Sequence, residues 1–251
     1  MSNAGRKILI EIKDFYVSFG DKSILKGINF KLYEGECLAL IGASGVGKSI
    51  LLRSMVGLEK PSRGKIFIED EDVTHFTESE FIKVRKKVAY AFQGGALFQS
   101  MTVYDNLAFP LRAHTQLNES SIEKIIKKEL DDLNLAGCEE KYPQELSGGM
   151  QKRVGVARSI IMSPKIILYD EPTTGLDPYN TRNMENMILR LQKRGATSIL
   201  VTHDMLSAKR VCDRVALLLD GDIRARGAPQ DLEKSHNKLL NHFISGTKGG
   251  Y

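Results

Sequence analysis

The apolar residues of this chain follow two different patterns. Near the N-terminus they partly alternate with polar residues, which is typical of half-buried strands, and turn residues such as Gly20 and Asp21 separate the runs. From Cys37 onward the apolar runs are continuous and helical segments follow them, which is typical of parallel strands covered on both faces. The predicted strands are residues 8–12, 15–19 and 28–32 in the first pattern and residues 37–41, 88–92, 166–169, 198–202 and 215–219 in the second.

One long segment between two of the continuous runs has a helical pattern. Residues 119–135 place apolar side chains at helical spacing, and Asn118 or Ser120 offers a cap at the start. We therefore predict an α/β fold with an N-terminal antiparallel β-subdomain and an α-helical insertion at about residues 94–165.

A glycine-rich loop follows the first continuous strand. It lies between residues 37–41 and a helix-compatible run at 50–55, which is the strand–loop–helix context of a phosphate-binding P-loop. Glycines let backbone N–H groups turn toward an anion, and a helix N-terminus adds partial positive charge. Lys48 can reach the β- and γ-phosphates, and the Ser49 hydroxyl can bind Mg²⁺. The predicted nucleotide-binding residues here are Gly42, Ala43, Ser44, Gly45, Val46, Gly47, Lys48, Ser49 and Ile50.

Two carboxylates follow another continuous strand. Asp170 and Glu171 come directly after residues 166–169, and in open α/β sheets ligands bind at the carboxyl ends of the strands. Asp170 is predicted to hold Mg²⁺, directly or through water, because this cation prefers hard oxygen ligands. Glu171 is predicted to orient or deprotonate an attacking water.

A second glycine-rich helix start lies further along the chain, before the two carboxylates. Ser147, Gly148 and Gly149 precede a helical run at 154–161, and Ser147 is predicted to cap that helix. The arrangement is typical of an anion-binding helix start, although it has no lysine of its own. One nucleotide does not require two such devices on a single chain.

Composition narrows the classes of partner. The 36 Lys and Arg against 31 Asp and Glu give a net charge of +5, spread along the chain without a basic cluster, so no nucleic-acid partner is expected. The three cysteines lie far apart, which argues against a disulfide framework or a zinc site. No apolar run approaches the roughly 20 residues that cross a bilayer, and the N-terminus lacks the apolar core of a signal peptide. A cytoplasmic protein, not embedded in a membrane, is therefore expected.

The order of the three motifs identifies a family. A P-loop, Leu-Ser-Gly-Gly before a helix and Tyr-Asp-Glu-Pro after a strand resemble the nucleotide-binding subunits of ABC transporters over essentially the whole chain. The resemblance implies a P-loop NTPase core of the RecA-like type, one nucleotide-binding domain over residues 6–240 with a C-terminal tail at 241–251, and ATP hydrolysis with Mg²⁺. It assigns Gln93 to Mg²⁺ and the attacking water, His203 to the γ-phosphate, Asp177 to the D-loop, and Phe19 to stacking on adenine. A plain core role for the Phe19 ring stays open.

In this family two domains enclose two ATP molecules head to tail. The resemblance implies that Ser147, Gly148 and Gly149 of one chain close on the ATP held by Lys48 of the other, which explains the second helix start. The chain is therefore expected to form a homodimer or to pair with a homologue. It would lie on the cytoplasmic face of the inner (plasma) membrane, bound to integral-membrane permease subunits that hydrolysis drives between two states. The implied catalytic residues are Glu171, His203 and Gln93, and the implied metal-binding residues are Ser49, Gln93 and Asp170.

One departure points to a subgroup. Most members of the family have Gln directly after the two glycines of the Leu-Ser-Gly-Gly motif, whereas this chain has Met150. With Met150 at this position and with its sequence over residues 92–117, the chain resembles the ATPases of Mla/Mce-type transporters. These transporters move phospholipid between the inner and outer membranes of Gram-negative bacteria. A lipid cargo, an Mce-type lipid-binding protein and a small regulatory subunit are the implied further partners. Apolar residues within 96–111 either receive a helix of the permease or pack the helical insertion.

Three other functions stay open at this point. The cargo could be a small polar solute or a drug-like molecule, because the ATPase subunit scarcely touches cargo in this family. A soluble ABC protein acting on ribosomes or DNA usually carries two nucleotide-binding domains or a long coiled-coil insertion, and neither is seen here. A regulatory module that binds ATP without hydrolysis is favoured by Met150 and opposed by Glu171, Gln93 and His203.

Overall fold

The N-terminal part of the chain forms an antiparallel sheet. The computed structural model describes residues 5–234. The predicted runs 8–12 and 15–19 form one strand with a register shift between Ile12 and Phe15, and it turns into its partner strand at the predicted Gly20 and Asp21. In spatial order the strands are β2 (Lys22–Tyr33), β1 (Ile8–Phe19), β4 (Arg63–Ile68) and β5 (Glu71–Asp72), and the sequence pattern did not predict the last two.

The second sheet holds the continuous apolar runs. Its first five strands pair in parallel and the last, which was not predicted, pairs antiparallel at one edge. The predicted strands at 37–41, 88–92, 166–169, 198–202 and 215–219 are confirmed within one or two residues. The strands are β3 (Cys37–Ile41), β6 (Val88–Ala91), β7 (Ile166–Asp170), β8 (Thr197–Thr202), β9 (Arg214–Leu219) and β10 (Asp222–Gly227), in the spatial order β10-β9-β3-β8-β7-β6.

This parallel sheet separates two hydrophobic cores. Along β3, Cys37, Ala39 and Ile41 pack into the core shared with α6 and α7, whereas Leu38 and Leu40 pack into the core shared with α1 and the antiparallel sheet. Both faces of the strand are therefore buried, which is why it reads as an unbroken apolar run. Here α1 spans Lys48–Met55, α6 spans Pro178–Lys193 and α7 spans Met205–Val211.

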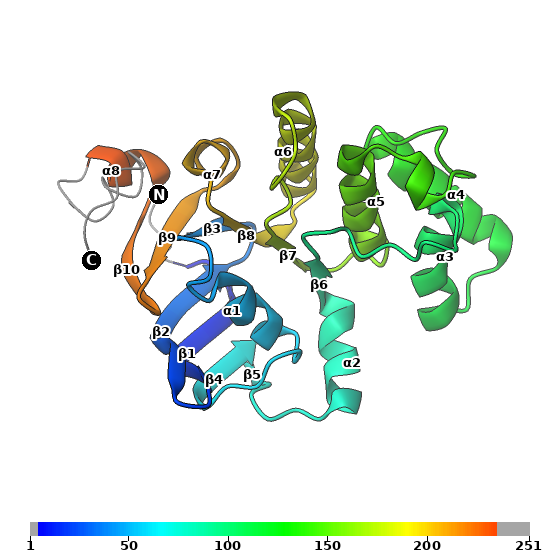
Figure 1. Ribbon diagram of the computed structural model, residues 1–251. Coiled ribbons are helices and arrows are strands. Elements are labelled where there is room, and N and C mark those ends of the chain that lie inside the picture. Colours follow the sequence, from blue (N-terminus) through cyan, green and yellow to red (C-terminus); the bar gives the residue numbers. More distant parts are fainter. Residues whose placement is uncertain (1–4, 235–251) are drawn as a thin grey trace.

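A helical lobe lies beside the edge strand β6. Figure 1 shows α3, α4 and α5, in green, grouped on that side and apart from α1. These helices are inserted between β6 and β7, as the sequence pattern predicts, and Asn118 caps the predicted helix by accepting a hydrogen bond from Ser121 N. The remaining helices are α2 (Glu78–Lys87), α3 (Val103–His114), α4 (Glu119–Asp132), the 3₁₀ turn η1 (Pro143–Glu145), α5 (Gly148–Ile160) and α8 (Pro229–Lys234).

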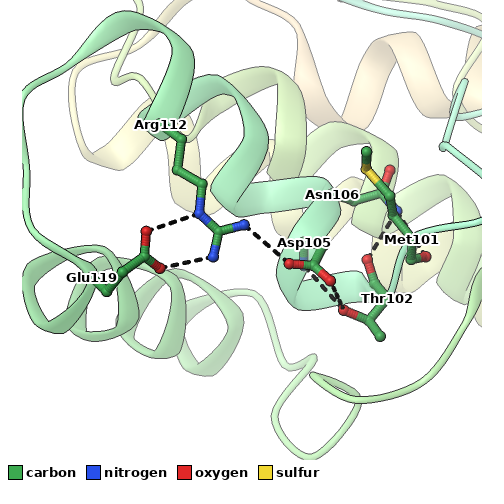
Figure 2. Close-up of polar contacts among 6 residues, drawn as sticks. All are labelled: Met101, Thr102, Asp105, Asn106, Arg112 and Glu119. Carbon is green, nitrogen blue, oxygen red and sulfur yellow. Dashed lines mark hydrogen bonds and ion pairs between the residues drawn. The ribbon is translucent and has the colours of Figure 1, made fainter.

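Polar contacts fix the start of this lobe. The fully buried Asn106 amide donates hydrogen bonds to the carbonyl oxygens of Met101 and Thr102 at 3.2 and 2.9 Å. Figure 2 shows these bonds and the Arg112 guanidinium, which bridges Asp105 on its own helix and Glu119 on α4. The buried amide orders the loop that enters α3, and the bridge joins α3 to α4.

The predicted end of the domain at residue 240 and the predicted tail at 241–251 lie outside the described residues. Within residues 5–234, no helix is both long and apolar enough to cross a membrane.

Candidate active site

The glycine-rich loop closes around the ammonium group of Lys48. This side chain is 4% exposed, and its Nζ donates hydrogen bonds to the carbonyl oxygens of Gly42 and Ala43 at 2.9 and 3.0 Å. The residue before α1, Gly47, has φ 107°, and a Cβ there would lie 2.7 Å from Leu25 Cδ2, so only glycine fits both the backbone and the space. The loop thus holds a buried cation at the N-terminus of a helix, where an anion is favoured.

The carboxyl end of β7 supplies the first carboxylate. Asp170 is 7% exposed, and its Oδ1 accepts a hydrogen bond from Ser49 Oγ at 2.7 Å. Its Oδ2 accepts one from the Tyr90 hydroxyl at 2.6 Å. Burial, and then the hydrogen bond to Asp170, raise the pKa of Tyr90 well above its ordinary value, so this phenol stays a donor.

These oxygen atoms suit a hard divalent cation such as Mg²⁺. Ser49 and Asp170 bring a hydroxyl and a carboxylate together at hydrogen-bond distance, and both are ligand types that this ion takes. Among residues 5–234 there is no cluster of three or more His, Cys, Asp or Glu side chains that could hold a metal without help. A cation here would therefore complete its shell with water and with oxygens of a bound phosphate.

The second carboxylate, Glu171, is held by several partners. Its backbone has φ 48°, a costly conformation for a residue with a side chain, and its N–H donates to Val201 O at 3.1 Å. Thr174 Oγ1 donates to Glu171 Oε2 at 2.7 Å, and Lys48 Nζ lies 3.5 Å from Oε1. His203 Nδ1 lies 3.4 Å from Oε2.

The charge state of Glu171 follows from these neighbours. Burial raises its pKa, but the hydrogen bond from Thr174 and the charges of Lys48 and His203 outweigh burial, so its pKa lies below the ordinary value. The group is therefore ionised at neutral pH. An ionised carboxylate can accept a hydrogen bond from a water and orient it.

An open pocket of about 350 Å³ lies at these groups. Of the residues singled out in the sequence, Gln93 and Glu171 line it together with the loop. Arg53 also lines it and was not predicted, although its position four residues after Ser49 on α1 is a usable signal. The lining residues are Ser44, Gly45, Gly47, Lys48, Ser49, Ile50, Arg53, Gln93 and Glu171.

Other predicted residues lie away from this pocket. Phe19 stands at the end of β1 with half of its surface exposed, and it is not a lining residue. Asp177 caps α6, accepting hydrogen bonds from the N–H groups of Tyr179 and Asn180 at 2.9 and 3.0 Å. Asp177 does not line the pocket either.

The second glycine-rich helix start is also separate. Ser147 caps α5 as predicted, accepting a hydrogen bond from Met150 N at 3.3 Å. A Cβ on Gly148 would meet no described atom within 4 Å, whereas one on Gly149 would lie 2.5 Å from the Asn180 side chain. Met150 is half-buried and packs against the core that the helical lobe shares with α6 and α7. The start of α5 is thus built locally and left open at Gly148.

A backbone contact joins the loop that carries Gln93, which lines the pocket, to α5. The chain turns after Gln93 with a hydrogen bond from Gly95 N to Phe92 O at 2.9 Å. A Cβ on Gly155, in the middle of α5, would clash with the backbone of Gly95. The loop that carries Gln93 therefore lies directly against α5, the helix that Ser147 caps.

The match to a protein-family model decides the family. The model described as "ABC transporter" matches residues 25–174, a span that holds the loop, the start of α5 and both carboxylates. The chain belongs to the ABC transporter family. It is the ATP-binding subunit, an ATPase of the P-loop type with an antiparallel β-subdomain and a helical subdomain, as the sequence predicts.

Three similar proteins extend this assignment. The "Probable ribonucleotide transport ATP-binding protein mkl" of Mycobacterium leprae is 38% identical over 244 residues, which cover 97% of this chain and 70% of that protein. The "Intermembrane phospholipid transport system ATP-binding protein MlaF" of Haemophilus influenzae is 35% identical over 243 residues, covering 96% of this chain and 92% of that protein. The dimeric, post-hydrolysis structure of the ATP-binding cassette MJ0796 bound to ADP and Pi has a TM-score of 0.81 and 28% identity, covering 88% of this chain and 99% of that one.

Three residues at the site of this ABC transporter ATPase were not predicted from the sequence. Arg53 lines the pocket, Tyr90 donates a hydrogen bond to Asp170, and Thr174 donates one to Glu171. Thr174 is three residues from Glu171 and could have been suspected from spacing. Tyr90 gives no such signal, because its partner Asp170 lies 80 residues away in the sequence.

Proposed function

We propose that this subunit powers a lipid transporter of the Mla/Mce type from the cytoplasmic face of the inner membrane. The likeness to MlaF supports this, because it covers almost the whole length of both chains. Permease subunits in the membrane would receive the motion, and an Mce-type lipid-binding protein and a small regulatory subunit are the further partners. A single nucleotide-binding domain over residues 6–240 would perform the hydrolysis.

In and around the pocket each group would have a separate task. Lys48 and the loop amides bind the phosphates, and Phe19 stacks on adenine. Ser49, Asp170 and Gln93 would hold Mg²⁺, which when bound neutralises phosphate charge. Glu171 orients the attacking water and accepts its proton, while His203 donates a hydrogen bond to the γ-phosphate. The observation that carries this proposal is that groups far apart in the sequence meet at the loop. Ser49 Oγ lies 2.7 Å from Asp170 Oδ1, and Lys48 Nζ lies 3.5 Å from Glu171 Oε1.

The start of α5 and Asp177 act on the other protomer of a homodimer. Ser147, Gly148 and Gly149 would close on the nucleotide that Lys48 holds in the second chain. The open space at Gly148 supports this, since a phosphate could approach the helix N-terminus there. The dimeric MJ0796 structure with ADP and Pi supports it as well.

The variant Glu171→Gln tests the catalytic and dimeric parts together. Loss of the carboxylate should lower turnover by at least about 100-fold while MgATP still binds. Light scattering of the purified full chain should then show the mass doubling from 28.0 kDa when MgATP is added. The matched control is Glu123→Gln, a carboxylate on the exposed side of α4. Normal turnover in Glu171→Gln would remove this residue from the catalytic role, and a monomer under saturating MgATP would remove the dimer.

The lipid cargo needs a test of its own. The subunit, purified with its own membrane partners and placed in vesicles, should move a fluorescent phospholipid when MgATP is added, and the Glu171→Gln complex should not. The alternative cargo is a small polar solute, which the name of the mycobacterial relative favours. Turnover that a ribonucleotide stimulates and phospholipid does not would decide for that alternative.

A further inference from the structure

A tyrosine hydroxyl contacts the carboxylate to which we assign the metal. The Tyr90 hydroxyl donates to Asp170 Oδ2 at 2.6 Å, and Ser49 Oγ donates to Oδ1 at 2.7 Å. The two donors come from β6 and α1, and Asp170 is only 7% exposed. Each oxygen of Asp170 is therefore held by one O–H group from a different element.

The strand register places the tyrosine there. β6 and β7 pair in parallel with Tyr90 opposite Leu168, and Asp170 follows two residues later, so Tyr90 and Asp170 face the same side of the sheet. The Tyr90 ring is packed against Phe92, with 4.5 Å between ring centroids. The hydroxyl thus reaches Asp170 from a ring that its neighbour keeps in place.

We propose that Tyr90 is a positioning residue for the metal: its hydroxyl fixes the plane of the Asp170 carboxylate so that the remaining lone pairs face the cation beside Ser49. The terminal torsion of an aspartate is broad and roughly two-fold, so a carboxylate held at one oxygen only can still turn. An ionised carboxylate offers about four acceptor positions, of which the two hydroxyls occupy two. Outer-shell partners of this kind change metal affinity by about 10–100-fold. The inference rests on the proposed function, because it takes Asp170 as a metal-holding group.

The variant Tyr90→Phe in the full chain tests this role. It keeps the ring and its contact with Phe92 and removes only the donor. Fluorescent ATP is titrated in EDTA and again over a range of Mg²⁺ concentrations, and Mn²⁺ binding is followed by electron paramagnetic resonance. We expect the half-saturating concentrations of Mg²⁺ and Mn²⁺ to rise about tenfold, at the lower end of outer-shell effects, with binding in EDTA unchanged.

Two controls separate positioning from folding. Tyr104→Phe, on α3, also removes a phenol hydroxyl and keeps its ring under Arg112, and it should leave the metal dependence unchanged. In an Asp170→Asn background, Tyr90→Phe should cause no further change, because the group that it positions is already lost.

The outcomes distinguish the inference from the proposal beneath it. If the wild-type chain binds ATP equally in Mg²⁺ and in EDTA and gives no Mn²⁺ signal, the metal assignment itself fails. If the wild type is metal-dependent and Tyr90→Phe follows the same curve, or loses binding equally in EDTA and in Mg²⁺, the role of Tyr90 is overturned.

Discussion

The two glycine-rich helix starts of this subunit are built in opposite ways. At α1 the loop surrounds Lys48, which is 4% exposed and bonded to two loop carbonyls, and a carboxylate of Glu171 lies 3.5 Å away. At α5 the cap Ser147 bonds to its own helix, and nothing described lies within 4 Å of a Cβ on Gly148. One helix start is surrounded by its own chain, and the other is open.

The difference shows which part of an ATP site a single chain can complete. A buried ammonium at the positive end of a helix is unfavourable unless oxygens surround it, and here carbonyls and Glu171 do so until phosphate arrives. The start of α5 carries no charged side chain in its first turn, so it can stay open without such partners. This difference supports our proposal that the first site is formed within one chain and that the start of α5 acts on a nucleotide held by a second chain.

The largest effect should come from Lys48→Ala. Removing the ammonium deletes charge-assisted hydrogen bonds to phosphate, each worth about 1.5–3 kcal/mol, so MgATP affinity should fall by at least about 100-fold. Isothermal titration of the full chain measures this, with Lys127→Ala on the exposed side of α4 as the control. Equal affinity in Lys48→Ala would mean that the α1 start is not the primary phosphate site.

A smaller effect is expected from Gly148→Asp. The new carboxylate has room in its own chain, but it would repel the phosphates of the nucleotide that the second chain holds. Turnover should therefore fall about 30-fold, or about 2 kcal/mol, while MgATP binding to the monomer is unchanged. Phosphate release and fluorescent ATP binding measure the two quantities. Ser120→Asp, at the exposed start of α4, is the matched change. Weakened binding to the monomer would show that α5 serves its own chain's site.

The contact between α5 and the loop that carries Gln93 can be tested with Gly155→Ala. The added Cβ clashes with the Gly95 backbone, and overpacking of this kind costs about 1–3 kcal/mol of unfolding free energy. Chemical denaturation measures the loss. Gly148→Ala is the comparison, because a Cβ there meets nothing and stability should not fall. Equal stability of the two variants would show that the loop carrying Gln93 and the α5 helix are not in firm contact.

The smallest effect concerns the framework beneath the first site. Glu69 bonds to Lys165, before β7, and to Lys87, before β6, and these bonds lower its pKa from 4.5 to about 2. A lowered pKa contributes stability above pH 4.5 that is lost as the pH falls toward 2. Because the two ion pairs of Glu69 lie near solvent, we expect them to contribute about 1 kcal/mol to the free energy of unfolding. Denaturation of the wild type and of Glu69→Gln should differ at pH 6 and converge near pH 2, with MgATP affinity at neutral pH unchanged.

The sequence determined the elements that are local in the chain. A strand, glycines and a helix in succession define the α1 start, and a serine before two glycines defines the cap of α5, because each arrangement is made by neighbouring residues. The continuous apolar runs likewise gave the parallel strands, since burial on both faces leaves no room for alternation. The short strands β4 and β5 were not predicted, because too few of their residues alternate between apolar and polar to distinguish a strand from a loop.

Only the tertiary structure decided which of these elements meet. Ser49 and Asp170 are 121 residues apart, and the Tyr90 hydroxyl reaches Asp170 only because β6 is the neighbour of β7 in a particular register. The contact of Gly95 with Gly155 depends in the same way on how a loop lies against a helix. Spacing along a chain fixes the face on which a side chain stands, but the neighbour it finds there depends on how distant elements pack.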